Sequence, residues 1–364
     1  MASHGLDTLF RDAVAAIDAG DVARLENLLQ QHPELVRERL TAPGEWLRSQ
    51  IGGALDGFFK DPYLLWFVTE DAVRTGQLSA NVAAIDAGDV ARLENLFQQH
   101  PELVRERLTT PGEWLRSQIG GALDGFFKDP YLLWFVTEDA VRTGQLSANV
   151  GAVARAIIDA AKRAGVPDLQ HQLDSTFHFA VCSPIGRGDG RQLELVDVLM
   201  DAGASTDGGP AQAFICHNEA AARHLIERGA RLTLPVALCL GMWDEVAALS
   251  PQATAEEKQV ALGLAALNGR AEALSRLLPL GVDLDAFTSG FYSHATALHH
   301  AVWSGSLAAV KVLVEAGAKL TTRDKAEDAT PLGWAEYART LPAPATEGKQ
   351  FKEIAAYLRE RGAQ

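Results

Sequence analysis

Positive charge and long apolar runs are both scarce in this 364-residue sequence. Its 33 lysines and arginines stand against 47 aspartates and glutamates, which gives a formal net charge of −14, and the two signs are interspersed, as in Arg359-Glu360-Arg361. Such a chain repels phosphate backbones and anionic lipid headgroups. The longest purely apolar run of the amino-terminal part, Tyr63–Val68, is far shorter than the ~20 residues that cross a bilayer. We therefore expect neither nucleic acid nor a membrane as a partner.

Cysteine is rare as well. The three cysteines, Cys182, Cys216 and Cys239, each lie in an apolar context, and none belongs to a C-x-x-C pattern. This is typical of buried, unreactive thiols in a reducing compartment. The first residues also lack the basic and then apolar segments of a secretory signal. We therefore predict three buried thiols and a cytoplasmic location.

Catalytic motifs are missing too. There is no G-x-S-x-G, no H-E-x-x-H, and no motif that ties Cys182 to a histidine. The stretch GRGDGR at 186–191 follows a predicted helix and lacks the P-loop pattern, so we interpret it as a flexible insertion between two helices of one repeat. His294, His299 and His300 lack the i, i+4 spacing of a zinc site. We predict no catalytic residue, no metal and no cofactor.

The sequence contains one segment that occurs twice in tandem. Residues Ala15–Val82 recur as Ala83–Val150, and the copies keep even surface positions that no fold dictates, which indicates a recent or engineered tandem duplication. The two copies differ at two positions only, Leu29 against Phe97 and Ala42 against Thr110. Looping one copy out would expose large apolar side chains worth roughly 1.5–3 kcal/mol each when buried. We therefore expect both copies to fold, with strain or disorder near Leu78–Val90.

Helical periodicity fills the duplicated part. Two short helices are predicted at 7–20 and 21–32, followed by two helices with aromatic residues at Glu45–Phe59 and Tyr63–Arg74, and the second copy repeats the pattern. Short antiparallel helices cannot bury their apolar faces alone, so they need neighbours.

The clearest amphipathic pattern follows the second copy. Ser147 is expected to cap a helix whose apolar residues over 150–161 recur at helical spacing. The first copy cannot make this helix, because Asp89 stands where Ile157 would fall and an unpaired buried carboxylate is costly. We expect Ser79–Ala87 to open the next helical unit instead.

From residue 166 onward the predicted helices end in a shared pattern, as in HLIERGARL and VLVEAGAKL. A glycine at this place can adopt the left-handed conformation that ends a helix. The predicted stop glycines are Gly203, Gly229, Gly281, Gly317 and Gly362. Helix openings of one type precede some of these helices: STFH at 175–178, TALH at 296–299 and TPLG at 330–333.

The unit at 293–319, SHATALHHAVWSGSLAAVKVLVEAGAK, resembles the ankyrin repeat family, whose consensus opens T-P-L-H-x-A and closes L-L-x-x-G-A. The resemblance is strong over 296–338, good over 175–204 and degenerate between them. The duplicated block resembles the irregular amino-terminal repeats of bacterial ankyrin proteins. The resemblance implies an all-α, ankyrin-type helical-repeat solenoid with irregular amino-terminal repeats. We divide it into 1–82, 83–165 and 166–364.

The resemblance also implies roles for single residues. The hydroxyl of Thr296 and the ring of His299 match the pair that ties a helix start to the preceding turn in ankyrin repeats, and Thr330 opens its helix in the same way. The same role is expected for His178. These residues and the stop glycines are therefore predicted to be structural.

In ankyrin proteins, hairpin tips and inner helices line a concave face that holds a protein partner. The best preserved hairpin, or finger, is Phe287–His294, which presents Phe291, Tyr292 and His294, and a second finger is predicted at Thr321–Ala329. The second finger carries Arg323 and Lys325. Exposed aromatic residues are frequent anchors of interfaces. The alternative, that Phe291 and Tyr292 pack on the next repeat, is equally compatible with the sequence.

Two functions follow from these patterns. The first is a scaffold that binds another protein through the concave face and the fingers, without enzymatic activity. The second is a small-molecule binding protein or enzyme, with a pocket in the duplicated segment lined by Trp46, Trp66, Trp114 and Trp134. The sequence does not indicate the oligomeric state.

Overall fold

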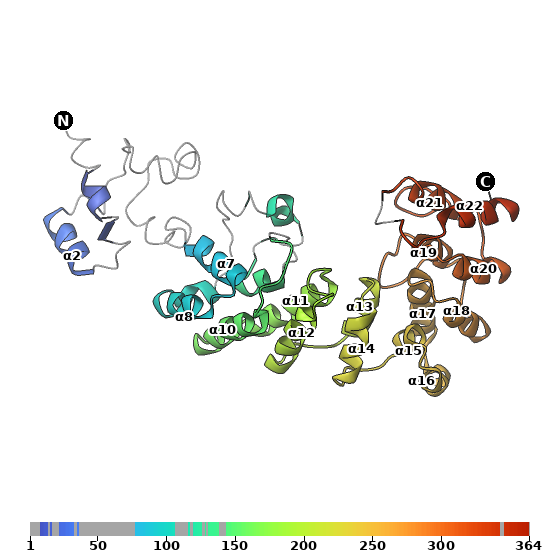
Figure 1. Ribbon diagram of the computed structural model, residues 1–364, viewed down its shortest axis with the longest axis horizontal. Helices are drawn as coiled ribbons and strands as arrows, with labels where there is room; N and C mark the ends of the chain where they lie inside the picture. Colours follow the sequence, from blue (N-terminus) through green and yellow to red (C-terminus); the bar gives the residue numbers. More distant parts are fainter. Residues whose placement is uncertain are drawn as a thin grey trace. The chain divides into compact units, whose positions relative to one another are not determined.

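The computed structural model of this chain shows stacked helix pairs (Figure 1). It describes residues 8–13, 15–16, 22–32, 35, 77–105, 116, 119–125, 128, 130–137, 143–342 and 346–363. In these ranges the chain has no β-strand, only the isolated antiparallel bridge between Phe287 and Thr296. The predicted all-α fold is thus confirmed. None of the described helices is long and apolar enough to cross a membrane.

The chain divides into two compact units, Met1–Gln172 and Leu173–Gln364. In the first unit, α10 contacts α8, η2 and η4, and α7 contacts α8 and η4. The apolar face of α10 is buried along its whole length, as its amphipathic pattern predicts. The elements are α2 (Val22–Gln31), α7 (Gln77–Ala87), α8 (Val90–Gln99), η2 (Pro101–Val104), η3 (Gly120–Asp124), η4 (Leu132–Thr137) and α10 (Val150–Arg163).

The seam between the two copies forms regular structure. Of the residues Leu78–Val90, where we expected strain or disorder, those up to Ala87 lie in α7, Gly88 and Asp89 form a turn, and Val90 begins α8. The Asp89 side chain accepts a hydrogen bond from Arg92 N at 3.0 Å. The expected opening of a new helix at Ser79–Ala87 is confirmed. The helices predicted at 45–59 and 63–74 lie outside the described residues.

Two details of the second copy differ from the prediction. The expected aromatic α-helix begins instead as the 3₁₀ helix η4, whose six residues are all buried. The N-cap of α10 is Asn149 and not Ser147, and the Asn149 side chain donates a hydrogen bond to Gly88 O at 2.7 Å. The Asn149 side chain thus bonds to the turn between α7 and α8 and does not cap the first turn of α10.

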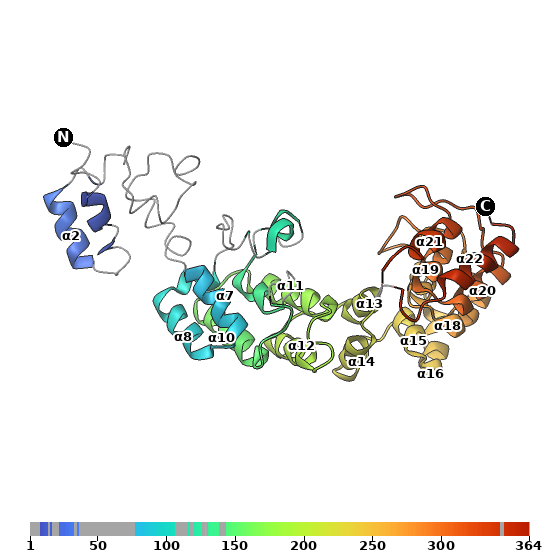
Figure 2. The ribbon, with the colours of Figure 1, turned by 45° about the horizontal axis from the view of Figure 1, so that its top comes forward.

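The second unit is a series of helix pairs in two rows (Figures 1 and 2). The first helices of successive pairs, α15, α17, α19 and α21, contact one another in order, and the second helices α18, α20 and α22 do the same. The helices are α11 (Leu169–Cys182), α12 (Arg191–Ala202), α13 (Gly209–Ile215), α14 (Glu219–Glu227), α15 (Leu234–Leu240), α16 (Trp243–Leu249), η5 (Ser250–Gln252), α17 (Ala255–Leu267), α18 (Ala271–Leu277), η6 (Leu278–Leu280), α19 (Ala297–Ser304), α20 (Leu307–Glu315), α21 (Pro331–Ala338) and α22 (Phe351–Glu360).

Glycines end several of these helices in the left-handed conformation. The φ angles are 105° at Gly203, 89° at Gly229, 77° at Gly281, 98° at Gly317 and 92° at Gly362. At Gly203 the amide N donates to Met200 O at 3.0 Å, which closes the last turn of α12.

The stretch STFH at 175–178 does not open a helix, contrary to the prediction. It lies inside α11, which is continuous from Leu169 to Cys182. His178 Nδ1 lies 2.7 Å from Asp174 O, one turn earlier in the same helix. No proline or glycine interrupts this segment, so the helix runs through the motif.

The prediction of three free thiols is wrong. Cys182 and Cys216 form a disulfide, and only Cys239 is a buried free thiol, whose pKa burial raises to about 12. The glycine-rich stretch at 186–191, predicted to be a flexible insertion, is anchored by hydrogen bonds. Arg187 donates hydrogen bonds to Ser183 O at 2.9 Å and to Cys216 O at 3.1 Å, so it joins the end of α11 to the end of α13.

Candidate functional site

The first finger, Phe287–His294, is closed at its base by backbone contacts. Thr288 N donates to Ala295 O at 3.0 Å, next to the bridge between Phe287 and Thr296. At the tip, Tyr292 has a φ of 40°, which is uncommon for a residue with a bulky side chain. The finger therefore holds Tyr292 in a conformation that its own preferences disfavour.

The two aromatic residues at this tip have different environments. Phe291 is half-buried, with its ring centroid 6.0 Å from that of His300, and a Cβ added at Gly263 on α17 would lie 3.2 Å from its Cζ. Tyr292 is 50% exposed, although its ring centroid also lies 6.1 Å from that of His300. Phe291 thus packs against the neighbouring helices, whereas Tyr292 is exposed.

The second finger, Thr321–Ala329, folds around the buried carboxylate of Asp324. This carboxylate accepts hydrogen bonds from the backbone N of Ala326 and Glu327, both at 2.8 Å, from Ala329 N at 3.0 Å, and from Trp334 Nε1 at 2.9 Å. Burial disfavours the charged form, but these hydrogen bonds outweigh it and lower the pKa of Asp324 to about 2. Asp324 is therefore ionised at any physiological pH.

The cationic residues of the second finger have partners within the fingers. Lys325 N donates to His294 O at 2.8 Å, which joins the two fingers, and Lys325 Nζ lies 4.0 Å from the ring centroid of Phe287. Arg323 forms an exposed ion pair with Asp328, at 3.4 Å between Nη1 and Oδ2. Of the five predicted partner-binding residues, Tyr292, Arg323 and Lys325 are exposed, and Phe291 and His294 are partly buried.

Thr296 and His299 hold the start of α19 against both fingers. His299 Nε2 donates to Ala329 O at 3.1 Å, because a carbonyl oxygen can only accept, so Nδ1 accepts from the Thr296 hydroxyl at 2.8 Å. Burial lowers the pKa of His299, and the bond to Ala329 partly offsets this. In the next repeat, the Thr330 hydroxyl accepts from Gly333 N at 3.2 Å.

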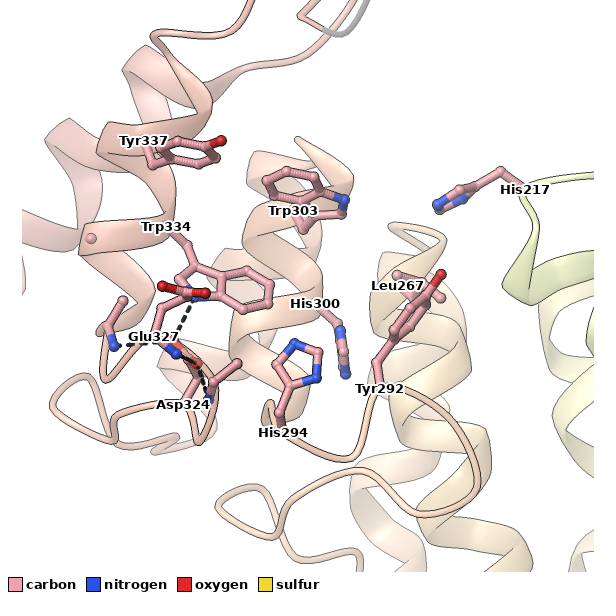
Figure 3. A pocket seen from close by; sticks show the side chains of 13 residues that line it. His217, Leu267, Tyr292, His294, His300, Trp303, Asp324, Glu327, Trp334 and Tyr337 are labelled. Atoms are coloured by element: carbon pink, nitrogen blue, oxygen red, sulfur yellow. Dashed lines mark hydrogen bonds between the residues drawn. The ribbon is translucent and has the colours of Figure 1, made fainter. Parts of the chain in front are cut away.

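A pocket of about 710 Å³ opens beside the fingers (Figure 3). Its volume lies in the range typical of ligand sites. The lining residues are His217, Leu267, Tyr292, His294, His300, Trp303, Asp324, Ala326, Glu327, Ala329, Gly333, Trp334 and Tyr337. Figure 3 shows Trp334 and Tyr337 extending from α21 toward Trp303 on α19.

His300 lies in the wall of this pocket, beneath the rings. Its side chain is buried, and its Nε2 has no hydrogen-bond partner among the residues that the structure describes. Burial is the main cause that lowers the pKa of His300 to about 3, and the neighbouring His299 and His294 lower it further. The His300 ring is therefore neutral near pH 7.

Sequence reasoning missed most of this wall, although a signal was present. Counted from the threonines at 296 and 330, His300 and Trp334 occupy the same position of successive repeats, and so do Trp303 and Tyr337. On each helix the two residues lie three positions apart, His300 and Trp303 on α19 and Trp334 and Tyr337 on α21, so they share a face of their helix. Stacking of α19 on α21 places the four rings together.

Two further histidines flank the start of α14. His217, which also lines the pocket, lies in the turn between α13 and α14 with a φ of 52°. His224 is on α14, 2.7 Å from Asp197 Oδ1. Across the described ranges, no group of three or more His, Cys, Asp or Glu could hold a metal ion.

Of the four tryptophans predicted to line a pocket in the duplicated segment, Trp134 belongs to the described residues. Trp46, Trp66 and Trp114 lie outside the described residues, and Trp134 is 5% exposed in the core. A pocket of about 300 Å³ in the first unit is lined by Phe97, Gln98, Pro101, Val104, Arg105, Ala160, Arg163 and Ala164.

Comparison with known proteins identifies part of the second unit. A search of curated proteins gave no match to the chain. Residues 236–324 match the model of a protein family described as ankyrin repeats in three copies. The matched range runs from within α15 to Asp324 and includes the whole first finger. This part of the chain consists of ankyrin repeats.

Proposed function

We propose that the chain is a scaffold that binds another protein through the finger surface, defined as the two fingers and the pocket beside them. The observation that carries the proposal is the half-exposed ring of Tyr292, held at the rim of a pocket lined by further rings. Ankyrin repeats generally mediate contacts between proteins. A tyrosine beside a deep pocket is a frequent interface anchor.

The other predicted residues have distinct parts in this proposal. Tyr292 and His294 line the pocket and present rings to the partner, and the exposed Arg323 and Lys325 supply positive charge on the second finger, outside the pocket. Phe291 supports the Tyr292 ring, with the two centroids 6.1 Å apart. Loss of the Phe291 ring should therefore weaken binding indirectly.

The finger surface is organised before any partner arrives. The four hydrogen bonds to Asp324 fix the second finger, and the bond from Lys325 N to His294 O joins it to the first. A surface with few freely rotating groups loses less conformational entropy on binding. This rigidity favours recognition of one partner shape.

The experiment is affinity capture from the source cells with the full chain, followed by quantitative mass spectrometry. Tyr292→Ala should deplete the specific partner at least tenfold, and Phe291→Ala less strongly. Trp243→Ala on α16, which removes a ring outside the finger surface, is the matched control. Identical partner amounts for the wild type and Tyr292→Ala would refute the proposal.

The second predicted function receives less support. The described part of the duplicated segment offers a smaller pocket, with Phe97 as its only aromatic lining residue. We therefore keep protein binding, without catalysis, as the proposed function.

Three predictions on organisation and origin remain proposals: the division at 82 and 165, the recent duplication in a bacterial protein, and the cytoplasmic location. The disulfide between Cys182 and Cys216 bears on the last of these, because cytoplasmic thiols are usually kept reduced.

A further inference from the structure

Aromatic rings from three parts of the chain, the first finger, α19 and α21, line the pocket beside the fingers. Trp303 from α19 and Trp334 from α21 meet edge to face, with centroids 5.9 Å apart. His294, from the first finger, lies 6.0 Å from Trp334 between centroids. Tyr292 and Tyr337 are exposed at the rim and extend the walls outward.

The charges in this wall are negative. Asp324 is ionised and Glu327 is exposed, whereas none of the thirteen lining residues is a lysine or an arginine. The His300 ring, which could otherwise carry a positive charge, is neutral because burial lowers its pKa to about 3. The wall therefore combines two carboxylates with the negative faces of several rings, an environment that attracts cations.

One of these rings already has a cation near it. Lys349 Nζ lies 5.9 Å from the centroid of Trp303 and 5.5 Å from that of Phe351. This distance is within the ~6 Å at which an ammonium group is attracted to an aromatic face. Lys349 does not itself line the pocket.

The type of cation follows from the hydrogen bonds of Asp324. Four N–H groups occupy its two oxygens, so this carboxylate offers charge but no free acceptor. A bare ammonium group would lose its hydration here without regaining hydrogen bonds from Asp324. A fully alkylated ammonium group has no N–H to satisfy, and its methyl groups suit a mostly apolar wall.

We propose that the pocket lined by Trp303, Trp334 and Tyr337 binds an alkylated ammonium group. The source of this group rests on the proposed function: if the chain binds a protein, the group is a methylated lysine of that partner. A free metabolite such as choline has the same chemistry and is the other source.

The test compares choline with 3,3-dimethylbutan-1-ol, which has the same shape but a neutral carbon in place of nitrogen. Titration of the full chain, followed by calorimetry or by tryptophan fluorescence, gives both affinities. Choline should bind about 3- to 30-fold more tightly, which corresponds to the range of cation–π energies. Equal affinities, or no binding of either compound, would overturn the proposal.

Variants locate the site. Tyr337 is 61% exposed, so Tyr337→Leu should fold normally and weaken choline at least threefold. Trp303→Leu should weaken it more strongly, and Trp303→Phe should restore part of the affinity. Trp243→Leu on α16, whose ring lies under Arg276 outside the pocket, is the matched control. Choline affinities unchanged by the Tyr337 and Trp303 variants would place the cation elsewhere and overturn the proposal.

Two peptides of one sequence, with a trimethylated or an unmodified lysine, distinguish the sources. Preference for the methylated peptide over both the unmodified peptide and free choline supports a protein partner. Binding of choline, with equal affinities for the two peptides, supports a metabolite as the ligand. The proposed cation site is then upheld, but it no longer supports the protein-binding function. If neither binds but Tyr292→Ala still abolishes capture, the pocket proposal fails and the proposed function stands.

Discussion

The carboxylate of Asp324 accepts a hydrogen bond from the indole of Trp334 at 2.9 Å. This bond joins the second finger to α21 and fixes the orientation of a ring in the pocket wall. Because the other acceptor positions of Asp324 are taken by the finger backbone, one buried side chain organises both the finger and the pocket.

Asp324→Asn should destabilise the second unit by about 2–3 kcal/mol, because an amide NH₂ would face N–H donors that lose their acceptor. Urea unfolding followed by tryptophan fluorescence measures this. Asp328→Asn, on the same finger with an exposed carboxylate, should stay within about 0.5 kcal/mol of the wild type. Equal effects of the two variants would contradict the role of the Asp324 bonds.

The same carboxylate predicts an acid-sensitive step. The pKa of Asp324 is about 2 in the folded chain and about 3.9 when unfolded, so its stabilisation is present above pH 4 and is lost as the pH falls toward 2. The loss is about 1 kcal/mol between pH 5 and pH 3 and reaches about 2 kcal/mol at pH 2. It should be absent in Asp324→Asn, as shown by urea unfolding at pH 5 and pH 3.

His300→Phe should remove a different pH dependence. The folded chain keeps His300 neutral with a pKa of about 3, whereas the unfolded chain binds a proton below pH 6.5. Stability therefore falls by up to about 1.4 kcal/mol per pH unit as the pH drops below 6.5. The difference in the free energy of unfolding between the variant and the wild type should therefore shift by about 2 kcal/mol in favour of the variant when the pH is lowered from 7 to 5. Parallel pH profiles of the two proteins would refute this.

Reduction of the Cys182–Cys216 disulfide should lower the free energy of unfolding by about 4 kcal/mol, because the bond closes a loop between residues 34 positions apart. Cys182→Ala/Cys216→Ala should behave like the reduced protein, and Cys239→Ala should keep the response to reductant. In denaturant without reductant, one thiol per chain should react, that of Cys239. Reaction of all three would show that the bond does not form.

Gly263→Ala should displace the first finger. An added Cβ would lie 2.6 Å from Thr288 Cγ2, so the finger must move even though alanine favours a helix by about 1 kcal/mol over glycine. We expect a net loss of about 1–2 kcal/mol and weaker partner capture. Thr288→Ser removes the opposing methyl group, so the double variant should recover part of the loss in thermal unfolding. No recovery would locate the effect elsewhere.

Local patterns were sufficient to predict much of the second unit. The threonine at 296, the histidine at 299 and the glycines after each helix are features of neighbouring residues, so the sequence shows them directly. The same logic failed at 175–178, where the motif is present but lies within the continuous helix α11. A short motif shows only that a helix can begin there. The residues before the motif decide whether the helix begins at the motif or earlier in the chain.

The candidate site was only partly predictable. Tyr292 was predicted from the resemblance to ankyrin repeats, and the structure shows that its ring is exposed, while its part in binding stays a proposal. Asp324 and Trp334 were missed, because a single carboxylate and a single indole carry no signal until the chain brings them within 2.9 Å.

The sequence by itself determined the helical periods, the positions of the turns and the resemblance to ankyrin repeats, because these depend on residues a few positions apart. Only the tertiary structure decided that Cys182 pairs with Cys216, that Asp324 is charged while His300 is neutral, and that four rings of two repeats share one pocket. These properties depend on burial and on distances between residues far apart along the chain, and folding alone sets both.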